Sequence, residues 1–252
     1  MEILITNDDS INAPGIKALI DCARDFGNIT VVAPLLPQSG QSSAITVDKP
    51  LRLTPCEEYN GARLFTVNGT PVDCVKIALH VLFRNKYPDL LLSGINHGSN
   101  SGCAIVYSGT MGAVLEGCMN GIQSVGFSLL SHSLQADFSM CRPFVTELIA
   151  QTINHPLPTA TCLNINMPAH IIPKGVKVCR ATSGHWSEEY KTYNDPTGRE
   201  FFMLAGNFVD AEPLATDTDE YYLRNGYISV VPVTTSMNDL KAIDSLKPIF
   251  EG

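Results

Sequence analysis

Two adjacent carboxylates near the start of the chain, Asp8 and Asp9, are the first residues whose types and spacing could do chemistry. They follow the apolar segment 2–6, whose composition is typical of a buried strand. Two carboxylates at a strand end repel each other unless a cation lies between them. The pair alone is therefore explained either by a bound divalent cation or by a solvated turn that begins a helix.

Three further loops, at residues 37–43, 67–71 and 93–110, are rich in Gly, Ser, Thr and Asn. Each alone could be an ordinary turn, but all three follow expected strands, as residues 6–10 do. Their carboxylate, hydroxyl and amide oxygens suit hard cations such as Mg²⁺, Mn²⁺ or Ca²⁺. The histidines and cysteines show no spacing typical of zinc. The four loops together predict a site for a hard divalent cation.

The segment Ser108-Gly109-Thr110 precedes an expected helix, so its backbone N–H groups and the helix dipole favour a phosphate group. His97 could be a general acid, although a structural or substrate-lining role is the preferred interpretation. Trp186, the single tryptophan, is interpreted as a packing residue. The sequence lacks the Walker A, Gly-x-Gly-x-x-Gly, Gly-x-Ser-x-Gly and His-Glu-x-x-His motifs, which weakens NTPase, dehydrogenase, serine hydrolase and metalloprotease interpretations.

Strands and helices alternate in the first part of the chain. We expect strands at residues 2–6, 29–33, 64–67, 89–92 and 124–130, helices at 14–26, 71–82 and 109–120, and a hairpin at 44–47 and 51–54. This order predicts an α/β fold with a Rossmann-like, mostly parallel sheet and helices on both faces. Right-handed crossovers then place the loops after the strands at one edge, where such sheets bind ligands.

After residue 161 the alternation stops. We expect strands at 162–166, 176–181, 201–204 and 227–232, several of them antiparallel, and a terminal helix at 240–250. The predicted organisation is a catalytic core at 1–160 and a β-rich C-terminal extension at 161–252, forming one structural unit. Because added edge strands need a partner or a cover, the extension predicts oligomerisation.

Composition excludes several partners. Asp and Glu number 25 against 17 Lys and Arg, and no basic run occurs, so a polynucleotide or an anionic membrane surface is not expected. No apolar stretch is long enough to cross a bilayer. The eight cysteines form no Cys-x-x-Cys pair and the N-terminal residues lack signal-peptide features, which predicts a cytoplasmic protein.

Five motifs resemble those of the survival protein E (SurE) nucleotidase family, and they occur in the family's order. They are Ile5–Asp9, Gln38–Gly40, Asn68–Pro71, Ser93–Gly98 and Tyr107–Thr110, with Gly226–Val230 resembling a later motif. The resemblance implies a Rossmann-like domain whose extension is used in dimer or tetramer contacts. It also implies hydrolysis of nucleoside 5′- and 3′-monophosphates that depends on one divalent cation, Mg²⁺ or Mn²⁺.

The matching positions imply roles for individual residues. Asp8, Asp9, Ser39 and Asn96 would bind the cation, and Ser39, Asn68, Ser108, Gly109 and Thr110 would contact the substrate phosphate. The catalytic set would be Asp8, Asp9, Asn96 and Ser108. Attack by water is favoured over attack by Asp8 or Asp9, since both carboxylates would be committed to the cation.

Two other functions also fit parts of the sequence. A receiver-like phosphorylation switch also places an acidic pair after its first strand, but the comparable later strand ends here carry Asn68 and Asn96. A non-catalytic nucleotide-binding module is the second alternative. Turnover of an aryl phosphate with Mg²⁺ or Mn²⁺ separates a metal-dependent phosphatase from both.

Overall fold

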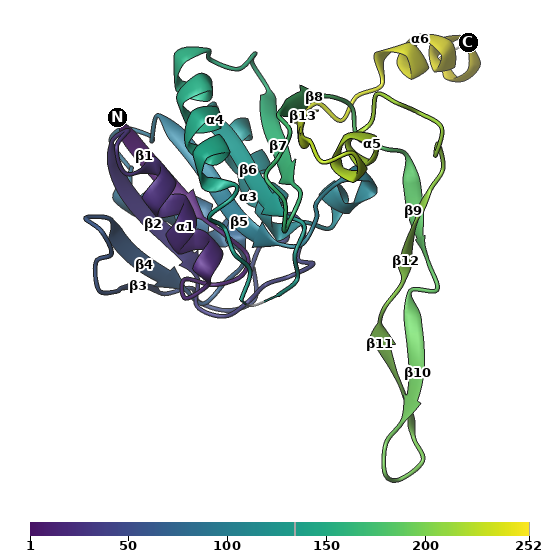
Figure 1. Cartoon of the computed structure of the whole chain (residues 1–252), viewed down its shortest axis with the longest axis horizontal. Helices are drawn as coiled ribbons and strands as arrows, with labels where there is room; N and C mark the ends of the chain where they lie inside the picture. Colours follow the sequence, from purple (N-terminus) through teal and green to yellow (C-terminus); the bar gives the residue numbers. More distant parts are fainter. Residues whose placement is uncertain (134, 252) are drawn as a thin grey trace.

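The computed structural model describes residues 1–133 and 135–251, and a nine-stranded sheet forms their centre (Figure 1). The spatial order of the strands is β3-β4-β2-β1-β5-β6-β7-β13-β8. Their bounds are β1 (Glu2–Thr6), β2 (Asn28–Pro34), β3 (Leu53–Pro55), β4 (Arg63–Val67), β5 (Leu90–His97), β6 (Gln123–Leu129), β7 (Thr161–Met167), β8 (Val176–Val178) and β13 (Ile228–Thr234). Strands β4, β2, β1, β5, β6 and β7 run parallel, whereas β3 and β13 are antiparallel to β4 and β7.

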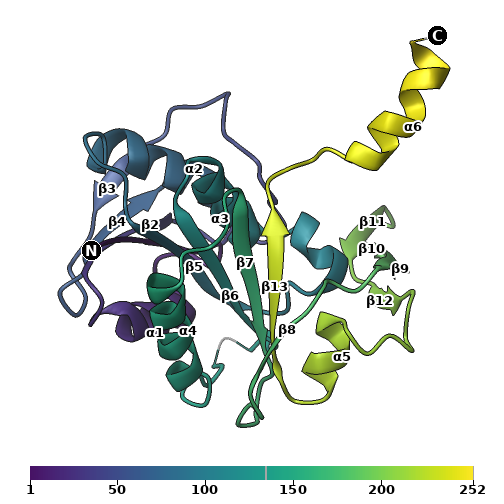
Figure 2. The same cartoon turned by 90° about the horizontal axis from the view of Figure 1, so that it is seen from above.

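Helices cover both faces of the sheet, α1 and α4 on one and α2 and α3 on the other (Figure 2). The helices are α1 (Pro14–Ala23), α2 (Pro71–Ile77, continued by a π-helical turn at Ala78–Leu82), α3 (Gly109–Met119), α4 (Arg142–Asn154), α5 (Asp219–Arg224) and α6 (Leu240–Phe250), with a 3₁₀ helix at Gly102–Val106. Strand β1 shows why two layers form. Ile3 and Ile5 join the core beneath α1 and α4, while Leu4 joins the core beneath α2 and α3, because side chains alternate along a strand.

The order of the strands fixes the place of a ligand site. From β1 the chain adds β2 and β4 on one side and then returns to add β5 on the other side. The crevice between the carboxyl ends of β1 and β5 is therefore the switch point at which such sheets bind ligands. The predicted α/β fold with helices on both faces is confirmed, and its polar loops after β1, β2, β4 and β5 lie at this edge.

The expected hairpin at 44–47 and 51–54 is wrong. Residues 44–47 form no strand, and β3 pairs with β4 instead. The backbone N–H and the hydroxyl of Thr46 donate hydrogen bonds of 3.0 and 2.6 Å to Asp73, and Thr70 donates one of 2.7 Å to the carbonyl of Ala44. These contacts hold the segment against the start of α2, so it cannot form a ladder.

The C-terminal part is divided between the sheet and a projection. Strands β7, β13 and β8 complete the main sheet, so the predicted division at residue 161 falls inside it. The extension itself is a long arm of antiparallel strands, β9 (Gly184–Ser187) with β12 (Asn207–Asp210) and β10 (Tyr190–Asn194) with β11 (Glu200–Leu204) (Figure 1). Helix α6 also stands away from the body, and none of its described residues is buried. The described chain contains no helix long and apolar enough to cross a membrane.

Candidate active site

Asp8 lies directly beyond β1 and is almost fully buried. Its carboxylate accepts a hydrogen bond of 2.6 Å from the hydroxyl of Thr110 in the first turn of α3. Gly109 permits this close approach, because a Cβ atom built there would lie 2.9 Å from the Cβ of Asp8. The backbone carbonyl of Asp8 accepts a hydrogen bond of 2.7 Å from the N–H of Gln38. Asp8 thus ties the loop after β2 and the start of α3 to the end of β1.

The two carboxylates are held in an unfavourable electrostatic environment. Burial, the largest effect, and the neighbouring charge of Asp9 raise the pKa of Asp8 to about 6, even though the Thr110 hydrogen bond lowers it. Burial also raises the pKa of Asp9, against a hydrogen bond from the N–H of His97 and the charges of His97 and His132. A bound cation would stabilise the ionised form of both carboxylates, since it places an opposite charge beside them.

Asn96 and His97 end strand β5, on the other side of the crevice from Asp8. The side-chain NH₂ of Asn96 donates to the carbonyl of Gly98 at 2.9 Å, which leaves the side-chain oxygen for a ligand. His97 is held by a contact of 2.9 Å between Nδ1 and the carbonyl of Ser133 and by an edge-on contact with Phe138. These contacts fix the orientation of the His97 ring, which also lines the cavity at this edge of the sheet, so they are compatible with the structural or substrate-lining role preferred from the sequence.

A cavity of about 490 Å³ opens at this edge of the sheet. Of the predicted site residues, Asp8, Ser39, Asn96 and Ser108 line it. Gly109 and Thr110 are not part of the wall, because they lie behind Asp8. Asp9 is not part of the wall either; its carboxylate accepts a hydrogen bond of 3.0 Å from the backbone N–H of His97. Asn68 is not part of the wall, because its side chain accepts from Arg52 N–H at 2.7 Å and steadies the neighbouring loop.

The donor set fits a hard divalent cation. Carboxylate oxygens of Asp8 and Asp9, the amide oxygen of Asn96 and the hydroxyl of Ser39 are ligand types that Mg²⁺ and Mn²⁺ prefer. No Lys or Arg is present among the described residues that line the cavity, so no side chain there carries a permanent positive charge. Among the described residues, no three His, Cys, Asp or Glu side chains are grouped so that they could hold a metal ion together, so a cation here would be bound by two carboxylates and neutral oxygens.

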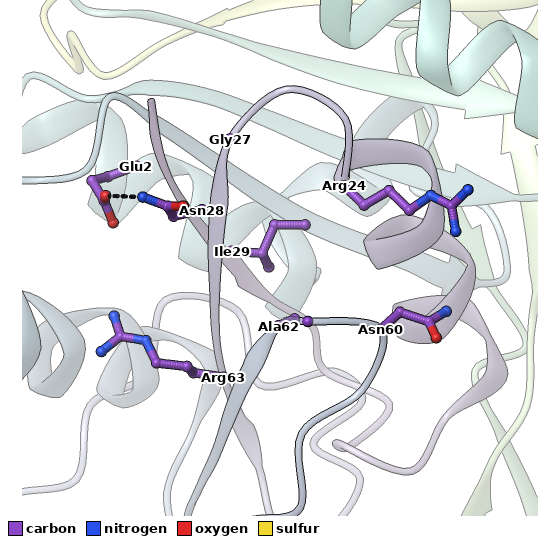
Figure 3. A pocket seen from close by; sticks show the side chains of 9 residues that line it. Glu2, Arg24, Gly27, Asn28, Ile29, Asn60, Ala62 and Arg63 are labelled. Atoms are coloured by element: carbon purple, nitrogen blue, oxygen red, sulfur yellow. Dashed lines mark hydrogen bonds between the residues drawn. The ribbon is translucent and has the colours of Figure 1, made fainter.

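A second cavity, of about 430 Å³, lies at the opposite edge of the sheet, where β1, β2 and β4 begin (Figure 3). Its charged side chains do not converge on one point. Arg24 and Arg63 point in opposite directions, and Glu2 accepts a hydrogen bond from Asn28 at 2.8 Å. The carboxyl-end cavity is the better candidate for chemistry, since it collects polar groups from several loops.

Comparisons with known proteins identify the family of the chain. The sequence model of the family described as Survival protein SurE matches residues 3–188. The chain belongs to the SurE family. It is 42% identical to the 5′-nucleotidase SurE of Phocaeicola vulgatus, over 97% of this chain and 95% of that protein. It is 46% identical to the 5′-nucleotidase SurE of Christiangramia forsetii, over 92% of this chain and 90% of that protein.

Solved structures give the same family relationship. The crystal structure of the SurE protein from Aquifex aeolicus is 32% identical in sequence and superposes with a TM-score of 0.84, over 99% of both chains. The family resemblance inferred from the five motifs is confirmed. All of the motif residues except those near Gly226 fall inside the matched segment.

Sequence reasoning missed a buried network that supports this SurE-family site. The N–H of Asn100 donates to the side chain of Asn166 at 2.8 Å, and the carbonyl of Asn100 accepts from Asn164 at the same distance. The side chain of Asn100 donates to Ser128 on β6 at 2.9 Å. This network fixes the loop that follows Asn96. Alternation along β7, which places Asn164 and Asn166 on one face, was the available signal.

Ser108 has a structural role besides lining the cavity. Its hydroxyl accepts a hydrogen bond of 3.0 Å from the N–H of Met111 and caps α3. We expect Ser108→Ala to lower the free energy of unfolding by about 1 kcal/mol through loss of the cap. We also expect kcat/KM for a phosphomonoester to fall by on the order of tenfold to a thousandfold if the hydroxyl also binds developing charge. Metal affinity, measured by calorimetry, should stay nearly unchanged.

A matched control separates the two effects of Ser108→Ala. Thr218, which does not line the cavity, caps α5 by the same type of hydrogen bond, here 3.3 Å from the N–H of Tyr221. Thr218→Ala should cost a similar amount of stability and leave kcat/KM unchanged. An equal loss of kcat/KM in both variants would show that Ser108 acts only through folding. A large loss of metal affinity in Ser108→Ala would contradict its assignment to phosphate.

Proposed function

We propose that this protein is a divalent-metal-dependent phosphomonoesterase that converts nucleoside 5′- and 3′-monophosphates to nucleosides and phosphate. The observation that carries the proposal is the pair of carboxylates, Asp8 and Asp9, held with raised pKa values where an α-helix begins. Membership of the SurE family supports it, as do the relatives named 5′-nucleotidase. The proposed activity is of the metal-dependent acid phosphatase type.

The chain's own residues would divide the work. Asp8, Asp9, Ser39 and Asn96 would hold one Mg²⁺ or Mn²⁺. The cation, when bound, would act as a Lewis acid on the phosphate and lower the pKa of a bound water. The N–H groups at the start of α3 and the hydroxyl of Ser108 would bind phosphate oxygens, helped by the helix dipole. Thr110 would hold the carboxylate of Asp8 in place through its 2.6 Å hydrogen bond.

Water is the preferred nucleophile. Asp8 lines the cavity, but its carboxylate is held from behind by Thr110 and Gly109, and Asp9 accepts a hydrogen bond from the N–H of His97. Neither carboxylate is therefore well placed to leave the cation and attack phosphorus. Acid quench during a single turnover of ³²P-labelled 5′-AMP tests this choice, since attack by a carboxylate would leave ³²P on the protein as an acyl phosphate, whereas direct attack by water leaves none.

The function is tested by phosphate release from 5′-AMP and 3′-AMP, measured on purified protein with Mg²⁺ or Mn²⁺. Turnover of both nucleotides supports the proposal. Saturable binding of AMP without turnover under any metal would instead identify a non-catalytic nucleotide-binding module.

We further propose a homodimer or homotetramer held by the projecting parts. The arm exposes large apolar side chains that a lone chain leaves in water, among them Phe202 and Leu204, which are 62% and 75% exposed. Helix α6 exposes Leu240, Ile249 and Phe250, each 70% or more. Patches of this kind are typical of protein–protein interfaces. Light scattering at micromolar concentration should give a multiple of 27.3 kDa, and a monomer would contradict the proposal.

The proposed setting is the cytoplasm, with a small nucleotide as the partner and no polynucleotide or membrane. All eight cysteines lie in the described part of the chain and are free thiols, which suits a reducing compartment. The net charge of −8 disfavours polyanions as partners.

A further inference from the structure

Part of the cavity wall is apolar and comes from the projecting arm, which also contributes Glu189. Trp186 in β9, Tyr190 in β10 and Leu204 in β11 line the same cavity as Asp8, Asn96 and Ser108. Tyr107, just before α3, adds a fourth large side chain to this wall. The cavity wall thus combines polar groups that suit a metal phosphate with aromatic side chains that nothing in the hydrolysis of phosphate requires.

Trp186 is fixed from behind rather than free on the surface. Its ring meets Phe208 of β12 edge-on, with 6.1 Å between ring centroids. Phe208 in turn packs into space left by two glycines, because a Cβ at Gly102 or Gly184 would lie 3.2 or 2.5 Å from its ring. The indole still remains 36% exposed. Phe208 is therefore a positioning residue that holds one side of the indole and leaves part of its surface to the cavity.

Building on the nucleotidase function above, we propose that Trp186 is the stacking platform for the nucleobase of the substrate, with Tyr107, Tyr190 and Leu204 completing that subsite. Every base has a π-face, so stacking on an indole binds any nucleoside without discriminating between bases by their hydrogen-bonding edges. The cavity volume of about 490 Å³ lies within the roughly 300–1,000 Å³ typical of small-molecule sites. A purine should bind better than a pyrimidine, since it offers more area.

Recognition by the arm also explains how an acidic protein selects a nucleotide. The cavity offers no lysine or arginine among its described lining residues, so the organic part of the substrate must supply binding energy besides that from the metal and the helix terminus. Phosphomonoesters without a base should consequently bind less well. The arm would thus contribute to substrate selection as well as to the proposed contacts between subunits.

The first test needs neither metal nor turnover. Trp186 is the only tryptophan of the chain, so its fluorescence reports on the subsite alone. Titration of the metal-free, full-length protein with adenosine in EDTA should quench the emission saturably, and ribose should not. Absence of saturable quenching up to millimolar adenosine would overturn the inference, whatever the protein does to phosphate esters.

The second test compares two substrates in two variants. Trp186→Ala should lower kcat/KM for 5′-AMP by roughly tenfold, mainly through KM, and leave kcat/KM for ribose 5-phosphate unchanged. The matched control is Tyr193→Ala, an exposed aromatic of the same arm that stacks on Phe201 and does not line the cavity. The control should leave both substrates unaffected.

The outcomes separate this inference from the proposed function. Equal losses for both substrates in Trp186→Ala would mean that the residue only supports the fold, which overturns the stacking role while the nucleotidase function stands. If the wild-type protein hydrolyses neither substrate but adenosine still quenches Trp186, the base subsite stands and the proposed hydrolysis fails.

Discussion

Asp8→Asn is expected to reduce kcat/KM for AMP by about a thousandfold or more and, at the same time, to stabilise the metal-free protein at pH 7.5. The loss of activity follows from removal of a charge that the cation requires. The gain in stability follows from burial, which raises the pKa of Asp8 from 3.8 to about 6. Above pH 6 the ionised carboxylate therefore costs the folded state about 3 kcal/mol.

The difference in stability between the wild type and Asp8→Asn should depend on pH. The folded protein holds the Asp8 proton more tightly than the unfolded chain does, so wild-type stability falls as pH rises from about 4 to 6. The advantage of Asp8→Asn should be fully developed above pH 6 and should vanish near pH 4. Because a buried amide has a desolvation cost of its own, we expect a net gain of about 1–3 kcal/mol at pH 7.5.

Urea unfolding in EDTA at pH 4.5, 6 and 7.5 measures the effect. Asp48→Asn is the control, since Asp48 is an exposed carboxylate on the loop before β3 and should show no gain. Saturating Mg²⁺ should stabilise the wild type and not Asp8→Asn, because only a protein that binds the ion gains from it. A destabilised Asp8→Asn variant at pH 7.5 would contradict this description of the carboxylate pair.

Asp9→Asn should weaken metal binding by on the order of tenfold to a hundredfold and make activity recoverable at high metal concentration. Asp9 keeps its shape in this variant but loses one of the two charges that balance the cation. The accepted hydrogen bond from the N–H of His97 can persist, so the fold should be preserved. Calorimetric titration with Mn²⁺, together with kcat measured across metal concentrations, provides the comparison.

Asn164→Ala is not a suitable control for that experiment, since it disturbs the loop near Asn96. Asp21→Asn is suitable, because Asp21 bridges Asn60 and Arg142 at a distance from the cavity. It should leave metal affinity unchanged. If Asp9→Asn binds Mn²⁺ as tightly as wild type, Asp9 is not a ligand and the assignment of the donor set fails.

The parallel sheet was predictable because its strands are short apolar runs closed by polar residues. Glu2–Thr6 and Leu90–His97 are buried on both faces, so hydrophobicity alone marks them. The terminal helix expected at 240–250 is also present, as α6 (Leu240–Phe250). Helix α4 was not predicted, because only three of its residues, Val145, Ile149 and Thr152, are buried and its apolar periodicity is therefore weak.

The expected hairpin failed for a different reason. The pairing of residues 44–47 is decided by Asp73 and Thr70, which lie more than 20 positions along the chain. The residues near 44–47 in the sequence do not indicate that such a contact forms. The same limit applies to the pairing of β13 with β7, which joins segments separated by a long arm.

The polar end of the site was accessible from sequence, since Asp8, Ser39, Asn96 and Ser108 follow strands that a parallel sheet brings to one edge. Asn68 also follows such a strand but contributes to a loop instead. Trp186 was interpreted as packing, which its contact with Phe208 supports, but its place in the cavity wall depends on where the arm leaves the body. The topology of a parallel sheet predicts that the strand ends lie together, but it does not predict the position of a projecting hairpin.

The most direct measurement is phosphate release from 5′-AMP by protein stripped of metal and then titrated with Mg²⁺ or Mn²⁺. The account predicts no turnover in verified metal-free protein, and full turnover once about one cation per chain is bound. Asp8→Asn should remain inactive throughout the same titration. Full activity in the metal-free sample, or undiminished activity in Asp8→Asn, would contradict the proposal that this cavity hydrolyses nucleotides with a bound cation.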